Sequence, residues 1–213
     1  MPERKSGLLS LVLFFIYFST PALLYAETTV LMLGDSLTEG TGVEKTKAYP
    51  HLVEQKLKAQ GFLAIKVINA GVSGSTTASA LSRLTWYLRD RPDILLLALG
   101  ANDGLRGLPI VQIKHNLAET IKLALSKGIR VILAGMKMPP NYGEDYTQKY
   151  EKVFLELAKE YGIKFIPFLL EGVAGDPKLN LPDGIHPNER GHQIISELVY
   201  KTLVKVINEP PSR

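Results

Sequence analysis

The sequence alternates short apolar runs with longer amphipathic stretches over most of its 213 residues, and this order restricts the possible folds more than any other feature. Short runs rich in Leu, Ile and Val are typical of strands, and longer stretches with apolar residues every three or four positions are typical of helices. The predicted strands are 29–33, 65–69, 94–99, 130–134 and 164–167, and the predicted helices are 49–60, 77–89, 111–127, 146–161 and 189–207.

Strict alternation of strand and helix predicts right-handed crossovers and a parallel sheet covered by helices on both faces, which is a three-layer α/β/α sandwich. The run ILLLAL at 94–99 is apolar on both faces, as a strand in such a sheet should be. We expect a single domain from 27 to 213. Ligands bind beyond the carboxyl ends of the strands in sheets of this kind, so the residues that follow each strand are the first candidates for a site.

The first 26 residues have the order of a secretory signal peptide. Arg4 and Lys5 precede an apolar run from Leu8 to Phe18, and small Ala26 stands at the expected cleavage point. The sequence therefore predicts an exported protein, periplasmic or secreted. Because Leu24 is larger than usual for its place before the cut, an uncleaved membrane anchor is the alternative. An ordinary core helix is disfavoured, since the segment has no polar face.

Composition excludes several classes of site and partner. The chain has no cysteine, which rules out a thiolate nucleophile, a disulfide framework and a Cys-bound zinc. His51, His115 and His192 lack clustered carboxylates at ligand spacing, so we expect no metal and no cofactor. The net charge is +4, but the lysines are spread along the chain, which argues against a nucleic-acid partner. Apart from its N-terminal segment we expect no membrane contact, and we expect a monomer.

Ser36 follows the first predicted strand, where its hydroxyl would lie at the edge of the sheet. A serine hydroxyl is a poor nucleophile until a base takes its proton. Among the four histidines, only His186 falls in a loop just before a helix, and Asn188 is placed to cap that helix. Asp183 lies three residues before His186, with Gly184 allowing the chain to turn. Asp183 can then orient the imidazole and leave its other nitrogen facing Ser36.

A tetrahedral intermediate formed on Ser36 would also need donors for its oxyanion. Gly74 follows the second predicted strand and could present a backbone N–H, and Asn102 follows the third and offers a side-chain amide. The N–H of Ser36 would be the third donor. Asp35 and Asp103 lie beside these residues, and we predict structural roles for them, Asp35 fixing the turn and Asp103 fixing the loop after Asn102.

Four segments resemble, in order, the four conserved blocks of the GDSL or SGNH hydrolases. They are GDSLTEG at 34–40, GVSG at 71–74, GANDG at 100–104 and DGIHP at 183–187. NDGLRG and PPNYG, in the loops after the third and fourth strands, look especially like bacterial periplasmic members of that family. The resemblance covers nearly all of the chain after the signal peptide.

This resemblance implies a flavodoxin-like sheet of five parallel strands and hydrolysis of esters or thioesters, with broad acyl specificity and no metal. It implies that Ser36 is the nucleophile and that Asp183 and His186 complete the triad. Gly74 and Asn102 are then oxyanion donors together with the N–H of Ser36.

The substrate is expected to be a small-molecule acyl ester, either a lysophospholipid, an acyl thioester or an aryl ester. Apolar residues in two loops could line an acyl-chain groove or simply anchor the loops. These residues are Leu105, Leu108, Ile110, Met138, Pro139 and Tyr142. Ala101 stands where close relatives commonly have glycine, which could narrow the pocket beside Asn102. A carbohydrate acetylesterase of the same fold is the alternative function.

Two other classes are disfavoured. An α/β-hydrolase should show G-x-S-x-G, but Thr38 occupies the position of the second glycine, and Asp183 and His186 are too close together in sequence. A flavodoxin-like module that binds FMN would use the loop after the first strand for phosphate, and Asp35 and Glu39 would repel phosphate there.

Overall fold

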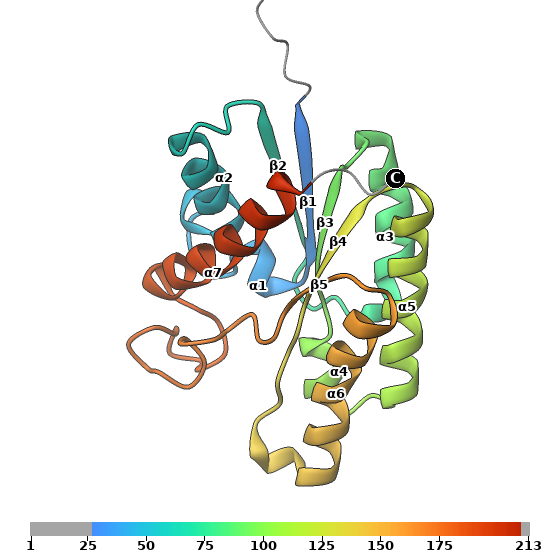
Figure 1. The fold of residues 1–213 in the computed structure, drawn as a ribbon. Helices are drawn as coiled ribbons and strands as arrows, with labels where there is room; N and C mark the ends of the chain where they lie inside the picture. The colour runs from blue at the N-terminus through green and yellow to red at the C-terminus, as the bar shows by residue number, and fades with distance from the viewer. Residues whose placement is uncertain (1–26, 210–213) are drawn as a thin grey trace, which may run out of the picture.

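The structure is a computed structural model that describes residues 27–209, and it has a central sheet with helices on both sides (Figure 1). The predicted signal peptide, residues 1–26, lies outside the described residues. No helix among the described residues is long and apolar enough to cross a membrane.

The sheet has five parallel strands in the order β2-β1-β3-β4-β5. The strands are β1 (Thr28–Gly34), β2 (Ile65–Gly71), β3 (Ile94–Ala98), β4 (Arg130–Ala134) and β5 (Lys164–Ile166). All five lie at the predicted places. The strand order reverses direction between β1 and β3, which is where ligands bind in open α/β sheets.

The register of the strands brings three chain segments together at the carboxyl edge. Gly34 at the end of β1 pairs with Gly71 at the end of β2 on one side and with Ala98 at the end of β3 on the other. The loops that follow these strands therefore begin side by side, although they are far apart in the sequence.

Helices cover both faces of the sheet, which confirms the predicted three-layer sandwich. Helices α2 and α7 pack together on one face, and α3, α5 and α6 cover the other (Figure 1). The helices are α1 (Ser36–Glu39), α2 (Tyr49–Ala59), α3 (Ala80–Tyr87), α4 (Ala101–Leu105), α5 (Ile110–Ser126), α6 (Glu144–Glu160) and α7 (Glu189–Asn208).

The core lies between the sheet and these helices. Leu31, Met32 and Leu33 in β1 are fully buried, as is every residue of β3. Each fully buried side chain of this size stabilises the fold by about 1.5–3 kcal/mol. The buried apolar strands thus form a rigid sheet, and the polar residues that follow the strands are positioned at its carboxyl edge.

Two segments differ from the sequence prediction. The helix predicted at 77–89 is shorter, because turns of 3₁₀-helix at Thr77–Ser79 and Leu88–Asp90 flank α3. The segment after β3 was expected to be a loop and instead forms the short helix α4. Its Gly104 packs so closely on Met138 and Tyr150 that a side chain at this position would overlap Met138. Tertiary packing therefore overrides the low helix propensity of this segment.

Candidate active site

Ser36 stands at the first position of α1, directly after the turn that ends β1. Asp35 is the N-cap of this helix, and its Oδ1 accepts a hydrogen bond of 3.0 Å from the backbone N–H of Leu37. A side chain at Gly34 would overlap Thr38, so the sharp turn from strand to helix needs glycine there. The turn lifts the Ser36 hydroxyl to the carboxyl edge of the sheet. Asp35 has the turn-fixing contact that the sequence predicted.

Ser36, His186 and Asp183 form one chain of hydrogen bonds. The Nε2 atom of His186 lies 3.0 Å from Oγ of Ser36, and its Nδ1 lies 2.7 Å from Oδ2 of Asp183. The other carboxylate oxygen of Asp183 accepts from the backbone N–H groups of His186 (3.0 Å) and Ile185 (2.9 Å). Hydrogen bonds from the backbone and ring of His186, and then from Ile185, lower the pKa of Asp183 to about 2. Asp183 is therefore a charged acceptor at neutral pH.

The loop that carries His186 is fixed at both ends. Gly184 adopts a left-handed conformation with φ of +69°, which lets Asp183 fold back onto His186. Asn188 caps α7, as predicted, because its Oδ1 accepts from the N–H groups of Arg190 and Gly191. The side-chain amide of Asn188 also donates to the backbone oxygen of Lys178 (2.9 Å). The imidazole is thus held at the sheet edge and not on a helix face.

Gly74, in the loop after β2, and Asn102, in the short helix α4 after β3, lie in neighbouring segments that contact each other. Gly74 has φ of +74° in a turn closed by a 3.2 Å hydrogen bond from the N–H of Ser75 to the oxygen of Val72. The Nδ2 atom of Asn102 donates to the backbone oxygen of Ser75 (3.0 Å). Asn102 lines the same pocket as Ser36, whereas Gly74 does not line it. One N–H of the Asn102 amide is thus held by the turn, and the second is free of that bond.

Asp103 is buried and binds Thr77, two residues after this turn. Its carboxylate accepts from the N–H of Thr77 (2.9 Å) and from the Thr77 hydroxyl (2.6 Å). The structural role predicted for Asp103 is confirmed, but the predicted partner is wrong. Because the Asp103 carboxylate is bonded to Thr77, it fixes the segment after β2 and not the loop after Asn102.

Asp35 is fully buried, with one oxygen on the Leu37 N–H and the other without a hydrogen-bond partner. Burial raises the pKa of Asp35 to about 6, against smaller opposing contributions from hydrogen bonds and from His186. Burial also lowers the pKa of His192 to about 4, and its Nδ1 accepts from the backbone N–H of Tyr49. His192 therefore serves as a neutral packing residue. Between residues 27 and 209, no group of acidic and histidine side chains is arranged to hold a metal ion.

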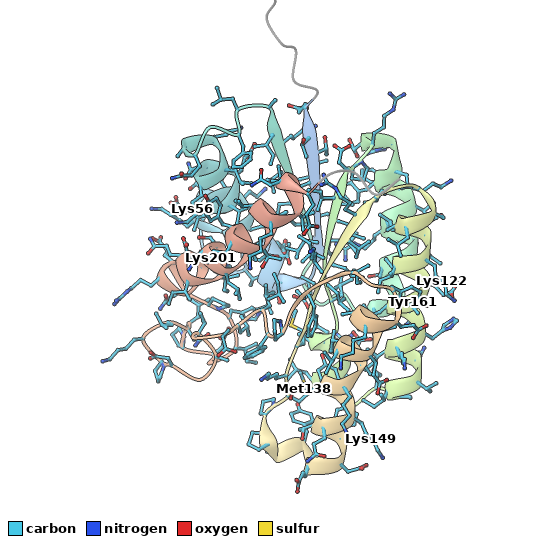
Figure 2. The ribbon with its side chains drawn as sticks, viewed as in Figure 1. Lys56, Lys122, Met138, Lys149, Tyr161 and Lys201 are labelled. Carbon is cyan, nitrogen blue, oxygen red and sulfur yellow. The ribbon has the colours of Figure 1, made fainter. Side chains whose placement is uncertain are left out.

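A pocket of about 570 Å³ opens beside Ser36 and His186. Its wall is mostly apolar and comes from α4 and from the loops after β4 and β5. Besides Ser36, Asn102 and His186, the lining residues include Leu37, Ala101, Leu105, Lys137, Met138, Pro139, Pro140, Phe168, Leu170, Ala174 and Ile185. Figure 2 shows Met138 beyond the carboxyl ends of the strands, beside α6.

The predicted substrate residues divide into two groups. Leu105, Met138 and Pro139 line the pocket, whereas Leu108, Ile110 and Tyr142 do not. These three make contacts that fit the alternative of loop anchoring. Leu108 and Ile110 pack against the core. The hydroxyl of Tyr142 donates a hydrogen bond of 3.0 Å to the backbone oxygen of Leu105.

Sequence reasoning missed the part of the wall that follows β5. Phe168 and Leu170 come directly after the last strand, and Ile185 stands next to His186. In the sequence these residues could have been recognised only by their apolar character, after a strand or within the DGIHP segment. Lys137 was also missed. Its Nζ lies 3.2 Å from Oε1 of Glu151 and 5.5 Å from the ring centre of Phe168.

The family model of the GDSL-like lipase/acylhydrolase family matches residues 32–194, which is most of the chain. The chain belongs to this family. It is 39% identical to an arylesterase of Vibrio mimicus over 199 residues, which cover 93% of this chain and 98% of the relative. It is 33% identical to thioesterase 1/protease 1/lysophospholipase L1 of Escherichia coli over 184 residues, 86% of each chain.

The fold agrees with these relatives. The crystal structure of the esterase TesA superposes with a TM-score of 0.81 at 34% identity, covering 84% of this chain and 99% of TesA. The predicted fold class and the predicted resemblance to the SGNH hydrolases are therefore confirmed, and the protein is a serine esterase of this family.

Proposed function

We propose that the protein is an exported esterase that cleaves carboxylic esters through an acyl-enzyme on Ser36. The observation that carries this proposal is the continuous hydrogen-bonded chain from Ser36 through His186 to Asp183, at the mouth of a 570 Å³ apolar pocket. A nucleophile, a base and an orienting acid at hydrogen-bond distance are the arrangement that acyl transfer requires.

In the first half-reaction, Nε2 of His186 takes the proton of the Ser36 hydroxyl while Oγ attacks the ester carbonyl. The tetrahedral intermediate then collapses, and His186 returns the proton to the leaving alcohol. In the second half-reaction, His186 takes a proton from water, which attacks the acyl-enzyme, and the carboxylic acid is released. Asp183 keeps its charge throughout and stabilises the imidazolium that forms twice per turnover.

The oxyanion of each tetrahedral intermediate would be stabilised by the N–H groups of Ser36 and Gly74 and by the side-chain amide of Asn102. The bond from Asn102 to the oxygen of Ser75 supports this role, because it fixes the plane of the amide and leaves the second N–H for the oxyanion. Donors that are fixed before the reaction stabilise developing charge without the cost of reorganisation.

The substrate class is an ester with an acyl chain longer than acetate. The wall beside Ser36 is mostly apolar, and each methylene buried there contributes about 0.8 kcal/mol. Aryl esters, acyl thioesters and lysophospholipids fit this chemistry, and the names of the relatives include all three activities.

Residues 1–26 are proposed to direct export and to be removed, leaving a single catalytic domain from residue 27 that acts as a monomer. The order of charged, apolar and small residues supports this proposal. Purification of the expressed full chain from a periplasmic fraction should give Glu27 as the N-terminal residue and the mass of a monomer. An intact N-terminus in the membrane fraction would support the uncleaved anchor.

The proposal is tested by Ser36→Ala, with hydrolysis of p-nitrophenyl butyrate as the assay. We expect kcat to fall by at least about 10³-fold, because only oxyanion stabilisation and binding would remain. Circular dichroism and Tm should stay close to wild type, since Ser36 contributes no core packing. A correctly folded variant that keeps more than a tenth of the wild-type rate would contradict a role for Ser36 as nucleophile.

A further inference from the structure

The turn that carries Gly74 is exposed, yet the proposed function requires its N–H to keep one direction. The turn runs from Val72 to Ser75, and φ of +74° at Gly74 is the value found at the third residue of a type II turn. The peptide between Ser73 and Gly74 is the central peptide of this turn and carries the Gly74 N–H. Rotation of that peptide would turn the N–H away, so contacts on both sides of it matter.

Glu39 holds the Ser73 side of this peptide. Its Oε2 accepts a hydrogen bond of 2.8 Å from the backbone N–H of Ser73 and a second one from the Ser73 hydroxyl. The hydroxyl of Thr41 lies 2.6 Å from that of Ser73. Hydrogen bonds to a carboxylate are about twice as strong as neutral ones. The bond from the Ser73 hydroxyl lowers the pKa of Glu39, so this acceptor is charged at neutral pH.

Arg106 holds the Gly74 side. A guanidinium N–H of Arg106 donates to the backbone oxygen of Gly74 over 3.2 Å. The peptide with the Gly74 N–H therefore lies between a carboxylate on one flank and a guanidinium on the other.

Glu39 is itself fixed relative to the nucleophile. It is the last residue of α1, the helix of which Ser36 is the first. The amide of Asn69 donates to the backbone oxygen of Glu39 (3.4 Å), and a side chain at Gly71 would overlap the backbone of Glu39. The helix thus packs tightly on the end of β2. A single helical turn connects the Ser36 hydroxyl to the carboxylate that holds the donor loop.

We propose that Glu39 is a positioning residue for ester hydrolysis, which acts through Ser73 to keep the Gly74 N–H directed at the oxyanion. This inference rests on the proposed function. Glu39 does not line the pocket beside Ser36, so its replacement should lower kcat and leave KM unchanged. A carboxylate that only stabilised the surface loop would change Tm and leave kcat unchanged.

The test compares Glu39→Ala, Glu39→Gln, Ser73→Ala and the double variant Glu39→Ala/Ser73→Ala on p-nitrophenyl butyrate. If the Gly74 N–H no longer points at the oxyanion in Glu39→Ala, kcat should fall by roughly 10-fold, with KM within about twofold of wild type. Glu39→Gln keeps the length and an acceptor oxygen, so it should recover most of the rate. Glu44→Ala removes the same charge from an exposed position nearby that makes no side-chain bond to the turn, and it should match wild type.

The double variant distinguishes a positioning role of Glu39 from a general loss of rigidity in the loop that carries Gly74. If Glu39 acts through Ser73, the double variant should lose no more rate than Glu39→Ala alone, because removal of the Glu39 carboxylate already breaks its bond with the Ser73 hydroxyl. Wild-type kcat in Glu39→Ala, a change confined to KM, or multiplied losses in the double variant would each overturn the inference. None of these results would affect the proposed function, which is tested separately by Ser36→Ala.

Discussion

The two walls of the active site are held in different ways. On the polar wall, each functional side chain has a directional hydrogen bond. Ser36 is bonded to His186, His186 to Asp183, and Asn102 donates to the backbone oxygen of Ser75. On the apolar wall, Met138 and Phe168 are kept in place by packing, on long loops after β4 and β5. Directional bonds restrict angles within narrow limits, whereas packing tolerates changes in shape. We therefore propose that separate parts of the chain determine the reaction geometry and the choice of substrate.

Replacement of Asp183 by Asn should give the largest effect on the polar wall after loss of Ser36. The amide is neutral and can donate to Nδ1 of His186, which favours the wrong imidazole tautomer and removes the charge that stabilises imidazolium. We expect kcat to fall by roughly 10³- to 10⁴-fold. Steady-state kinetics with p-nitrophenyl butyrate measure this, and a loss of less than tenfold would show that Asp183 has no part in catalysis.

Asn102→Ala should have the next largest effect. Removal of one oxyanion donor lowers kcat by roughly 10²- to 10³-fold, with little change in KM. The variant also removes the bond to the oxygen of Ser75, so its Tm has to be compared with wild type. A rise in KM at constant kcat would place Asn102 among substrate contacts and would remove one directional element from the polar wall.

Changes on the apolar wall should alter selectivity and leave the chemistry intact. Met138→Ala and Phe168→Ala each enlarge the pocket, and the ratio of kcat/KM for long to short p-nitrophenyl esters should change by about 10-fold in favour of longer chains. Val111→Ala, which truncates an exposed apolar residue outside the pocket, is the matched control and should keep the wild-type ratio. An equal loss on all chain lengths would contradict the separation of the two walls.

Asp35 should affect stability with a defined dependence on pH. Its folded-state pKa of about 6 lies above its ordinary value of 3.8, so the folded state binds the proton more tightly. Stability from this group is complete below pH 3.8 and is lost as the pH rises through 6, by up to about 3 kcal/mol. Asp35→Asn keeps a capping oxygen and removes the titration. Thermal unfolding from pH 4 to 8 should show a smaller decline for the variant than for wild type, and parallel curves would contradict this assignment.

The strands and the polar wall could be predicted from the sequence because both depend on local patterns. The apolar runs predicted the five strands. Because the carboxyl ends of parallel strands meet at one edge, the segments with Ser36, Gly74 and Asn102, which follow β1, β2 and β3, could be expected to be neighbours. The cap at Asn188 and the turn at Gly184 could both be recognised in the sequence, and together they predicted that the Asp183 carboxylate folds back onto the His186 ring. Strands, caps and turns of this kind can be predicted from neighbouring residues alone, without knowledge of long-range contacts.

The apolar wall could be predicted only in part, through Leu105, Met138 and Pro139, because the rest of it depends on how long loops pack. Ile110 begins α5 and packs on the core, which no periodicity in the loop before it indicated. Phe168 and Leu170 reach the pocket only because the chain after β5 crosses the edge of the sheet near Ser36. Helix α4 formed against its own propensity for the same reason, since Gly104 fits under Met138.

The central claim is that Ser36 is the nucleophile at the junction of the two walls, and covalent labelling tests it most directly. The intact protein is treated with a fluorophosphonate that carries an alkyl chain, and its mass and labelled peptide are determined. We expect one phosphonyl group per chain, on Ser36, with no labelling of Ser36→Ala and strongly slowed labelling of Asp183→Asn. Labelling of another residue, or equal labelling of the Ser36→Ala protein, would contradict the account.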